Sequence, residues 1–232
     1  MKESSIVVLI SAGTEWRVVL AAYPKAVLHN SPFGTYFYAD IPVRQQANGV
    51  LFFQGGWGKI NAAASTQYAI DHFAPQYLIN LGTCGGFEGE VQPGDIILAD
   101  RTIVYDIVEQ MGDPQAAITA YTTEIDLSWL GTNYPSPVTR TTLISADQDL
   151  VAEQIPNLIA KYQAVAGDWE SGAIAYIANC NQIRCLILRG VSDIVGPGGG
   201  EAYGNIEIFR ERTKSIMDTA LNDLPGWIAL LP

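Results

Sequence analysis

Cysteine, histidine and charged residues are all scarce in this chain of 232 residues, and each scarcity excludes a class of protein. The three cysteines, Cys84, Cys180 and Cys185, cannot form an even disulfide framework, so we expect reduced thiols in a cytoplasmic protein. Only two histidines are present, and no spacing of Cys, His or acidic residues is typical of a metal site. We therefore expect neither a metal nor another cofactor.

Basic residues and long apolar runs are also lacking. Lys and Arg number 13 against 24 Asp and Glu, which gives a net charge of −11. Because nucleic acid and anionic membranes select basic surfaces, we expect neither as a partner. The first apolar run, residues 6–10, is too short for a signal peptide, and no run approaches the ~18 residues of a membrane helix. These absences predict a soluble cytoplasmic protein that acts on a small molecule.

The chain does contain enough apolar material for a large core. Hydrophobic residues make up 48% of it and charged residues only 16%, which argues against disorder and favours a single domain over residues 1–232. Apolar strands alternate with helices, so we predict an α/β fold of three α/β/α layers. The expected strands are 6–10, 35–41, 49–54, 77–81, 95–105, 139–145 and 184–189. The expected helices are 15–22, 59–72, 151–163, 171–180 and 205–223. We expect an irregular stretch with short elements over 106–138 and a flexible loop at Gly196–Gly200.

Polar side chains gather where one buried strand is expected to end. Arg189, Ser192 and Asp193 close the apolar run that begins at Cys185. The carboxyl ends of parallel strands are where open α/β sheets bind ligands, and Arg and Asp are seldom buried without a partner. Glu170 opens the small-residue helix that precedes this strand. Helix and strand therefore bring Glu170 and Asp193 toward one crevice.

Each of these residues also fits a purely structural role. Asp193 fits a turn before Gly196, and Glu170 fits a first-turn acid favoured by the helix dipole. Arg189 fits a strand-end residue paired with any surface acid. We assign a structural role to Asp168.

Six segments follow one family pattern in chain order. They are Ser11–Glu15, Gly56–Ala63, Asn80–Gly86, Val91–Ile96, Asp168-x-Glu170-x-x-Ala173 and Arg189-x-x-Ser192-Asp193. Together they resemble the nucleoside phosphorylase and nucleosidase superfamily, and most closely its methylthioadenosine/S-adenosylhomocysteine nucleosidase branch. The resemblance covers roughly residues 5 to 195. It implies a mixed central sheet with barrel character and a homodimer whose interface completes the substrate pocket.

The resemblance also implies roles for individual residues. Asp193 donates a proton to the departing purine, for which burial must raise its pKa. Glu170 accepts the ribose hydroxyls and stabilises the cationic sugar. Glu15 positions water, and Arg189 orients the carboxylates or bridges to a hydroxyl. The remaining contacts to substrate are expected from Trp169, Ser192, Thr83, Gly85 and Leu150.

Two assignments stay open on sequence alone, namely the residue that positions water and the identity of the nucleophile. A shift of one position puts Trp16 in place of Glu15, and Glu15 also fits a helix N-terminal acid. Asn80 stands where phosphorylases typically carry a phosphate-binding Arg, and Arg17 is only near the place of a second one. Because phosphate needs donors and positive charge, water is the simpler nucleophile.

We therefore predict a purine nucleosidase that hydrolyses the N-glycosidic bond of an adenine nucleoside such as methylthioadenosine or S-adenosylhomocysteine. The alternatives are a phosphate-dependent phosphorylase of the same fold and a catalytically silent nucleoside-binding relative. The chain departs from the nucleosidase pattern twice. Trp169 replaces a Met, and Ser145–Leu150 lacks the aromatic residue that stacks on adenine. Tyr105, Phe87 and Trp57 are candidates to replace that stack.

Overall fold

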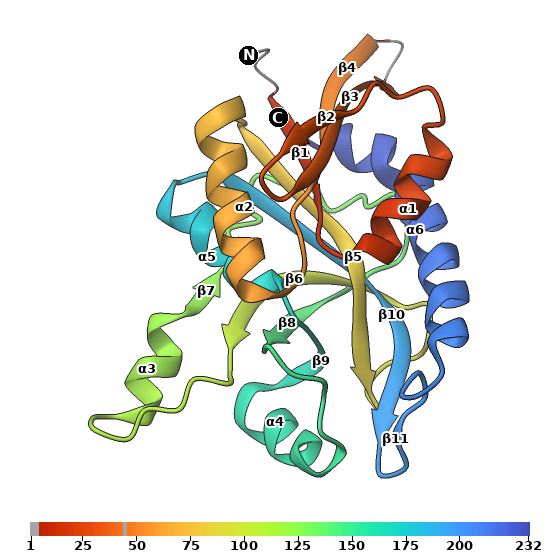
Figure 1. The fold of residues 1–232 in the computed structure, drawn as a ribbon. Coiled ribbons are helices and arrows are strands. Elements are labelled where there is room, and N and C mark those ends of the chain that lie inside the picture. Colours follow the sequence, from red (N-terminus) through yellow and green to blue (C-terminus); the bar gives the residue numbers. More distant parts are fainter. Residues whose placement is uncertain (1–4, 44–45) are drawn as a thin grey trace.

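The computed structural model describes residues 5–43 and 46–232 of the chain (Figure 1). Its elements, in chain order, are β1 (Ile6–Ile10), α1 (Gly13–Ala22), β2 (His29–Ser31), β3 (Gly34–Val43), β4 (Gln46–Gln54), α2 (Gly58–Phe73), β5 (Tyr77–Phe87), β6 (Ile96–Val104), α3 (Pro114–Ala120), β7 (Thr122–Glu124), β8 (Thr139–Ser145), the 3₁₀ turn η1 (Ala152–Gln154), α4 (Ile155–Tyr162), β9 (Ala164–Asp168), α5 (Ser171–Cys180), β10 (Arg184–Gly196), β11 (Gly199–Gly200) and α6 (Ile206–Ile228).

Within the described residues, eleven strands form one mixed sheet that closes on itself in part. β10 pairs with β6, β6 with β8, β8 with β9 and β9 with β5, and β5 pairs in turn with β10. This circuit combines parallel pairs, such as β5 with β10, and antiparallel pairs, such as β5 with β9. The α/β class, the mixed sheet and its barrel character are confirmed, whereas the stricter three-layer stacking stays a prediction.

Helices cover the sheet on two sides. Figure 1 shows α1 and α6 on one side and α2 and α5 on the other. All five residues of β1 are buried because the strand lies between β4 and β5 and is apolar throughout. Small residues dominate the buried face of α5, namely Ser171, Gly172, Ala173, Ala175 and Ala178. They let this helix pack closely, and its first residue follows directly on Glu170.

The structure differs from the sequence prediction at three glycine-rich or short segments. Gly82–Gly86, expected to be a loop, continues β5, because β10 on one side and β9 on the other fix its backbone. Gly196–Gly200 forms a tight hairpin between β10 and β11, so it is not simply a flexible loop. The strand β9 was not predicted, since its five residues carry no long apolar run, and its pairing with β8 and β5 is a tertiary effect.

Most other elements lie where they were predicted, but some boundaries differ. β10 continues past its expected end at 189 to Gly196 because β5 pairs with it along this length, so Asp193 lies within the strand. Pro156 lies in the first turn of α4, as expected for a residue that starts this helix, and α6 runs beyond its expected end to Ile228. Cys84, Cys180 and Cys185 are free thiols. Among the helices in the described part of the chain, none is long and apolar enough to cross a membrane.

Candidate active site

A cavity of about 590 Å³ opens where β1, β8, β9 and β10 end and where β5 passes between them. This volume lies within the usual range for small-molecule sites. Eight of the nine predicted site residues line the cavity, namely Glu15, Thr83, Gly85, Leu150, Trp169, Glu170, Ser192 and Asp193. The ninth, Arg189, does not line it but lies behind the wall. The structure therefore brings eight of the predicted residues together around one cavity, and their roles stay a prediction.

Asp193 is presented to the cavity by a bulge in β10. The register between β10 and β5 shifts between Val191 and Asp193, and such bulges redirect side chains. Asp193 Oδ1 lies 2.7 Å from the hydroxyl of Ser192, whose oxygen also lies 3.2 Å from the carbonyl of Cys84. Burial raises the pKa of Asp193 above its ordinary value of 3.8. The carboxyl therefore keeps its proton to higher pH than an exposed Asp, which suits a proton donor.

Glu170 lies at the N-terminus of α5 and reaches across to α2. Its Oε1 accepts a hydrogen bond of 3.1 Å from the backbone amide of Gly58. Burial raises the pKa of Glu170 to about 8, although the nearby Arg189 guanidinium opposes this change. Burial disfavours the ionised form of this carboxyl. Hydroxyl donors or a positive charge in the cavity would stabilise the carboxylate.

The raised pKa predicts how a glutamine at this position changes stability. Because the folded-state pKa of Glu170 lies above its ordinary value of 4.5, the stability it contributes is full below that value and is lost as pH rises through about 8. Glu170→Gln does not titrate. The melting temperature of Glu170→Gln minus that of wild type is expected to be larger at pH 8.5 than at pH 5, by about 2–4 °C or more. A difference in melting temperature that stays constant across this range would contradict the raised pKa.

Glu15 is held in the first turn of α1 by groups from β5. Its Oε1 accepts hydrogen bonds from the amide and the hydroxyl of Thr83, at 2.7 and 2.9 Å. Its Oε2 accepts from the Ala12 amide at 3.2 Å, so Glu15 also caps its own helix. Burial raises the pKa of this carboxyl as well. Trp16, the alternative assignment, is buried in the core and donates its indole N–H to Thr35, so it does not face the cavity.

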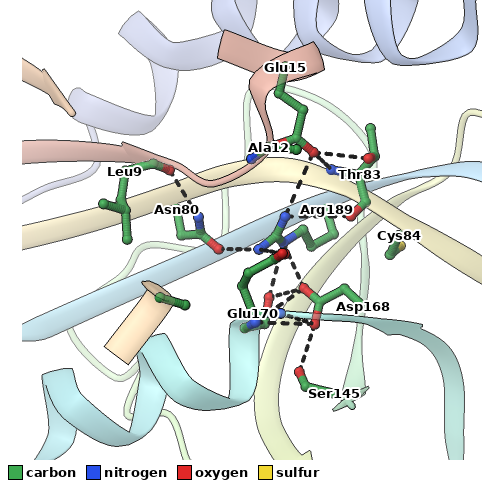
Figure 2. A network of polar contacts seen from close by, with 12 residues as sticks. Leu9, Ala12, Glu15, Asn80, Thr83, Cys84, Ser145, Asp168, Glu170 and Arg189 are labelled. Atoms are coloured by element: carbon green, nitrogen blue, oxygen red, sulfur yellow. Dashed lines mark hydrogen bonds and ion pairs between the residues drawn. The ribbon is translucent and has the colours of Figure 1, made fainter. Parts of the chain in front are cut away.

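Arg189 contacts the carboxylates of Glu15, Asp168 and Glu170, as Figure 2 shows. Its side chain is 1% exposed, with Nε 2.9 Å from Asp168, NH1 3.9 Å from Glu15 and NH2 3.7 Å from Glu170. NH2 also donates to Asn80 Oδ1 at 2.8 Å. The alternative of a strand-end arginine paired with a surface acid is therefore wrong. Arg189 contacts three buried carboxylates and does not line the cavity, which is the geometry of a residue that positions them.

Asp168, to which we assigned a structural role, lines the cavity and also ties neighbouring elements together. It accepts hydrogen bonds from the hydroxyls of Ser145 and Ser171 and from the Ser171 amide. These contacts tie the ends of β8 and β9 to the first turn of α5. The orientation of the neighbouring Glu170 depends on this arrangement.

Gly82 makes room for the charged network. A Cβ at this position would clash with Arg189 NH1 and would lie 2.8 Å from Glu15 Oε1. The absence of a side chain therefore lets the guanidinium and the carboxylate lie directly against β5. This close approach, rather than a phosphate-binding loop, explains the glycine.

Basic groups near the cavity are few, and most are already paired. Asn80 donates to the Leu9 carbonyl and accepts from Arg189, so it is buried in the network and does not line the cavity. Lys59 pairs with Asp106 and Asp147, and Arg101 pairs with Glu124. Among the described residues, Arg17 is the one basic side chain that lines the cavity. The same residues include no group of three or more His, Cys, Asp and Glu placed to hold a metal ion.

The two tryptophans of the site stack on each other. Trp57 and Trp169 have ring centroids 4.7 Å apart with the planes inclined by 23°. Trp57 directly precedes Gly58, whose amide binds Glu170, so the pair lies at the Glu170 end of the cavity. Phe87 is fully buried, and neither Phe87 nor Tyr105 lines the cavity. Of the three candidates for a stacking residue, only Trp57 reaches it.

Comparison with known proteins identifies the family of the chain. The family model of the phosphorylase superfamily matches residues 7–222. The chain belongs to the phosphorylase superfamily. A 5'-methylthioadenosine/S-adenosylhomocysteine nucleosidase from a Marinomonas species is 34% identical over 103 residues, which cover 44% of this chain and 43% of that protein. The enzyme of the same name from Staphylococcus saprophyticus is 29% identical over 174 residues, which cover 70% of this chain and 75% of that protein.

A solved structure confirms the superfamily fold. The 5'-methylthioadenosine/S-adenosylhomocysteine nucleosidase from Helicobacter pylori has a TM-score of 0.78 to this chain. The alignment covers 97% of this chain and 98% of that one at 16% identity. At this identity the likeness speaks for the fold alone.

Several residues that line the cavity were not singled out from the sequence. They come from the segment after β10 and from the start of α6, namely Ala202, Tyr203, Gly204, Ile206 and Phe209. The hairpin of β10 and β11 folds this segment back, and no motif marks it. The only available signal was its closeness in the chain to Asp193.

Proposed function

We propose that this chain hydrolyses the N-glycosidic bond of an adenine nucleoside, such as methylthioadenosine or S-adenosylhomocysteine, with water as the nucleophile. The observation that carries the proposal is the convergence of Glu15, Glu170 and Asp193 on one cavity, with Arg189 behind them. The names of the matched relatives support this substrate class. A single domain over residues 1–232 would hold all of these groups.

The geometry supports a division of labour among the three carboxyl groups. Asp193, whose raised pKa favours the protonated form, donates its proton to the departing base as the bond to the sugar breaks. Glu170 accepts the ribose hydroxyls, and its negative charge stabilises the cationic sugar in the transition state. Glu15 Oε1 is occupied by Thr83, whereas Oε2 receives only the long bond from Ala12 among the described contacts. Glu15 therefore has capacity left to orient a water molecule and take its proton.

The charges of the site favour water over phosphate. Four of the lining carboxyl groups, Glu15, Asp168, Glu170 and Asp193, are buried, while Arg17 is the sole basic lining residue of the described chain. A phosphate dianion would need several donors and positive charge to offset these acids. Asn80 is committed to Arg189 and Leu9, and it therefore supports no phosphate site.

Release of free base from a panel of nucleosides tests the proposal. The panel contains methylthioadenosine, S-adenosylhomocysteine, adenosine, inosine and guanosine. We expect free adenine from the first two at a higher kcat/KM than for inosine or guanosine. Absence of base release from every nucleoside, together with measurable nucleoside binding, would support the catalytically silent relative instead.

We further propose a cytoplasmic homodimer whose interface borders the cavity. Ile60, Val108 and Met111 are exposed apolar residues, and the Lys59–Asp106 ion pair holds their two segments together. Trp57, which lines the cavity and is also exposed, adjoins the same surface. Large exposed apolar patches are typical of protein interfaces. Sedimentation at micromolar concentration is expected to give the mass of a dimer, and a monomer there would contradict this assignment.

A further inference from the structure

The segment 145–150 leaves one face of the expected base site without an aromatic residue. Asp149 stands where the resemblance expects a stacking ring, and it lines the cavity with Gln148 and Leu150. We propose that Tyr203, from the segment after β10, covers the purine base and supplies this aromatic contact. The inference rests on the proposed function, because it assumes that the base lies next to Asp193.

Tyr203 lies at the Asp193 end of the cavity. It lines the cavity, and its hydroxyl donates a hydrogen bond of 2.8 Å to the carbonyl of Leu150. This bond links the segment that follows Asp193 to the segment that follows β8. The carboxylates of Asp149 and Asp193 are both near enough to help raise the pKa of the phenol, after burial as the main cause. Tyr203 and Asp193 thus line the same cavity, and the β10–β11 hairpin folds the segment of Tyr203 back along the strand that carries Asp193.

The backbone holds Tyr203 in place from two directions. β11 pairs with the end of β10, and the amide of Glu201 donates to the Ile194 carbonyl. Arg212 of α6 binds the side chain of Glu201 and the carbonyl of Ser192. The segment is thus tied both to the strand that carries Asp193 and to the helix behind it.

Gly200 gives the ring its space. A Cβ on Gly200 would lie 2.7 Å from three atoms of the Tyr203 ring, a distance that real Cβ atoms do not reach. The ring therefore packs flat against bare backbone on one side. Its other surface remains available, since Tyr203 is 44% exposed.

Two of the other aromatic residues of the cavity are committed to each other. Trp57 and Trp169 stack on each other at the Glu170 end. Phe209 belongs to the first turns of α6 and has no contact with Leu150 comparable to that of the Tyr203 hydroxyl. Tyr203 is the aromatic residue that is hydrogen-bonded to the 145–150 segment from within the cavity.

Binding of two fragments separates a base contact from a general effect on the site. The dissociation constants of adenine and of methylthioribose are measured by calorimetry for wild type, Tyr203→Ala and Tyr203→Phe. Loss of a base–aromatic stack weakens binding by between about 5-fold and about 150-fold. We expect Tyr203→Ala to weaken adenine within this range and to leave methylthioribose within about twofold. Tyr203→Phe keeps the ring and is expected to bind adenine within about threefold of wild type.

Tyr121→Ala is the matched control, since Tyr121 is equally exposed at 44% and does not line the cavity. It is expected to change neither constant. Unchanged adenine binding in Tyr203→Ala, or equal weakening of both fragments, would overturn the inference. Loss of adenine binding in Phe209→Ala alone would assign the contact to Phe209. Hydrolysis by wild type is measured in parallel, so that a failure of the proposed function is seen separately.

Discussion

Replacing Asp193 with asparagine is expected to lower kcat for adenine nucleoside hydrolysis by about 10²–10⁴-fold, the usual contribution of a general acid. An amide can accept the hydrogen bond from Ser192, so the fold and the cavity are retained, but it cannot transfer a proton to the base. The melting temperature of Asp193→Asn is expected to stay within a few degrees of wild type. Steady-state kinetics of base release measures the effect.

Asp149→Asn is the control for this prediction. Asp149 also lines the cavity, but it is exposed and has no partner comparable to Ser192. We expect it to keep kcat within about tenfold of wild type, well short of the loss assigned to a general acid. Retention of more than a tenth of wild-type turnover in Asp193→Asn would remove the general-acid role from Asp193.

In wild type, activity is expected to fall as pH rises through the elevated pKa of Asp193, because the proton to be donated is then lost.

Replacing Arg189 with methionine is expected to destabilise the protein by about 3–5 kcal/mol, the cost of leaving buried charge without its partner. The guanidinium is the common counter-ion of Glu15, Asp168 and Glu170, all of which are buried. Without it, the pKa values of Glu15 and Glu170, which the guanidinium lowers, rise further. Chemical denaturation at pH 7 measures the loss.

Arg210→Met is the matched control, since Arg210 forms an exposed ion pair with Glu207 on α6. Exposed pairs contribute at most about 1 kcal/mol, so little change in stability is expected. Arg189→Lys provides a folded variant if the methionine substitution prevents folding. It keeps the charge but loses the fork of donors that binds Asp168, Asn80 and Glu170 in different directions. Equal stability of Arg189→Met and wild type would contradict the counter-ion role.

Much of the site could be predicted because its residues lie at the ends of local elements. Asp193 follows the apolar run 185–188 and Glu170 precedes a small-residue helix, so each local pattern already marks its side chain as a candidate. Glu15 follows β1 in the same way. The strand β10 itself continues past Asp193 to Gly196. The helix α5 was predicted with its observed boundaries, Ser171–Cys180, because small residues and the break after Cys180 are both local signals.

What could not be predicted depends on contacts between distant segments. The contact of Arg189 with Glu15, which lies 174 positions earlier, is present only in the folded chain. The requirement for glycine at position 82 comes from the side chains of Arg189 and Glu15, which pack against it, and not from the backbone conformation of Gly82. Tyr203 reaches the cavity because the β10–β11 hairpin turns the chain back, and a run of glycines in the sequence indicated only flexibility.

The fate of the anomeric carbon tests the central claim most directly. The reaction is run with methylthioadenosine in ¹⁸O-labelled water, with and without inorganic phosphate, and the sugar product is analysed by mass spectrometry. We predict free methylthioribose that carries the label at carbon 1, formed at the same rate in phosphate-free buffer. A strict requirement for phosphate, with unlabelled sugar 1-phosphate as the product, would contradict the account and point to Arg17 as part of an anion site.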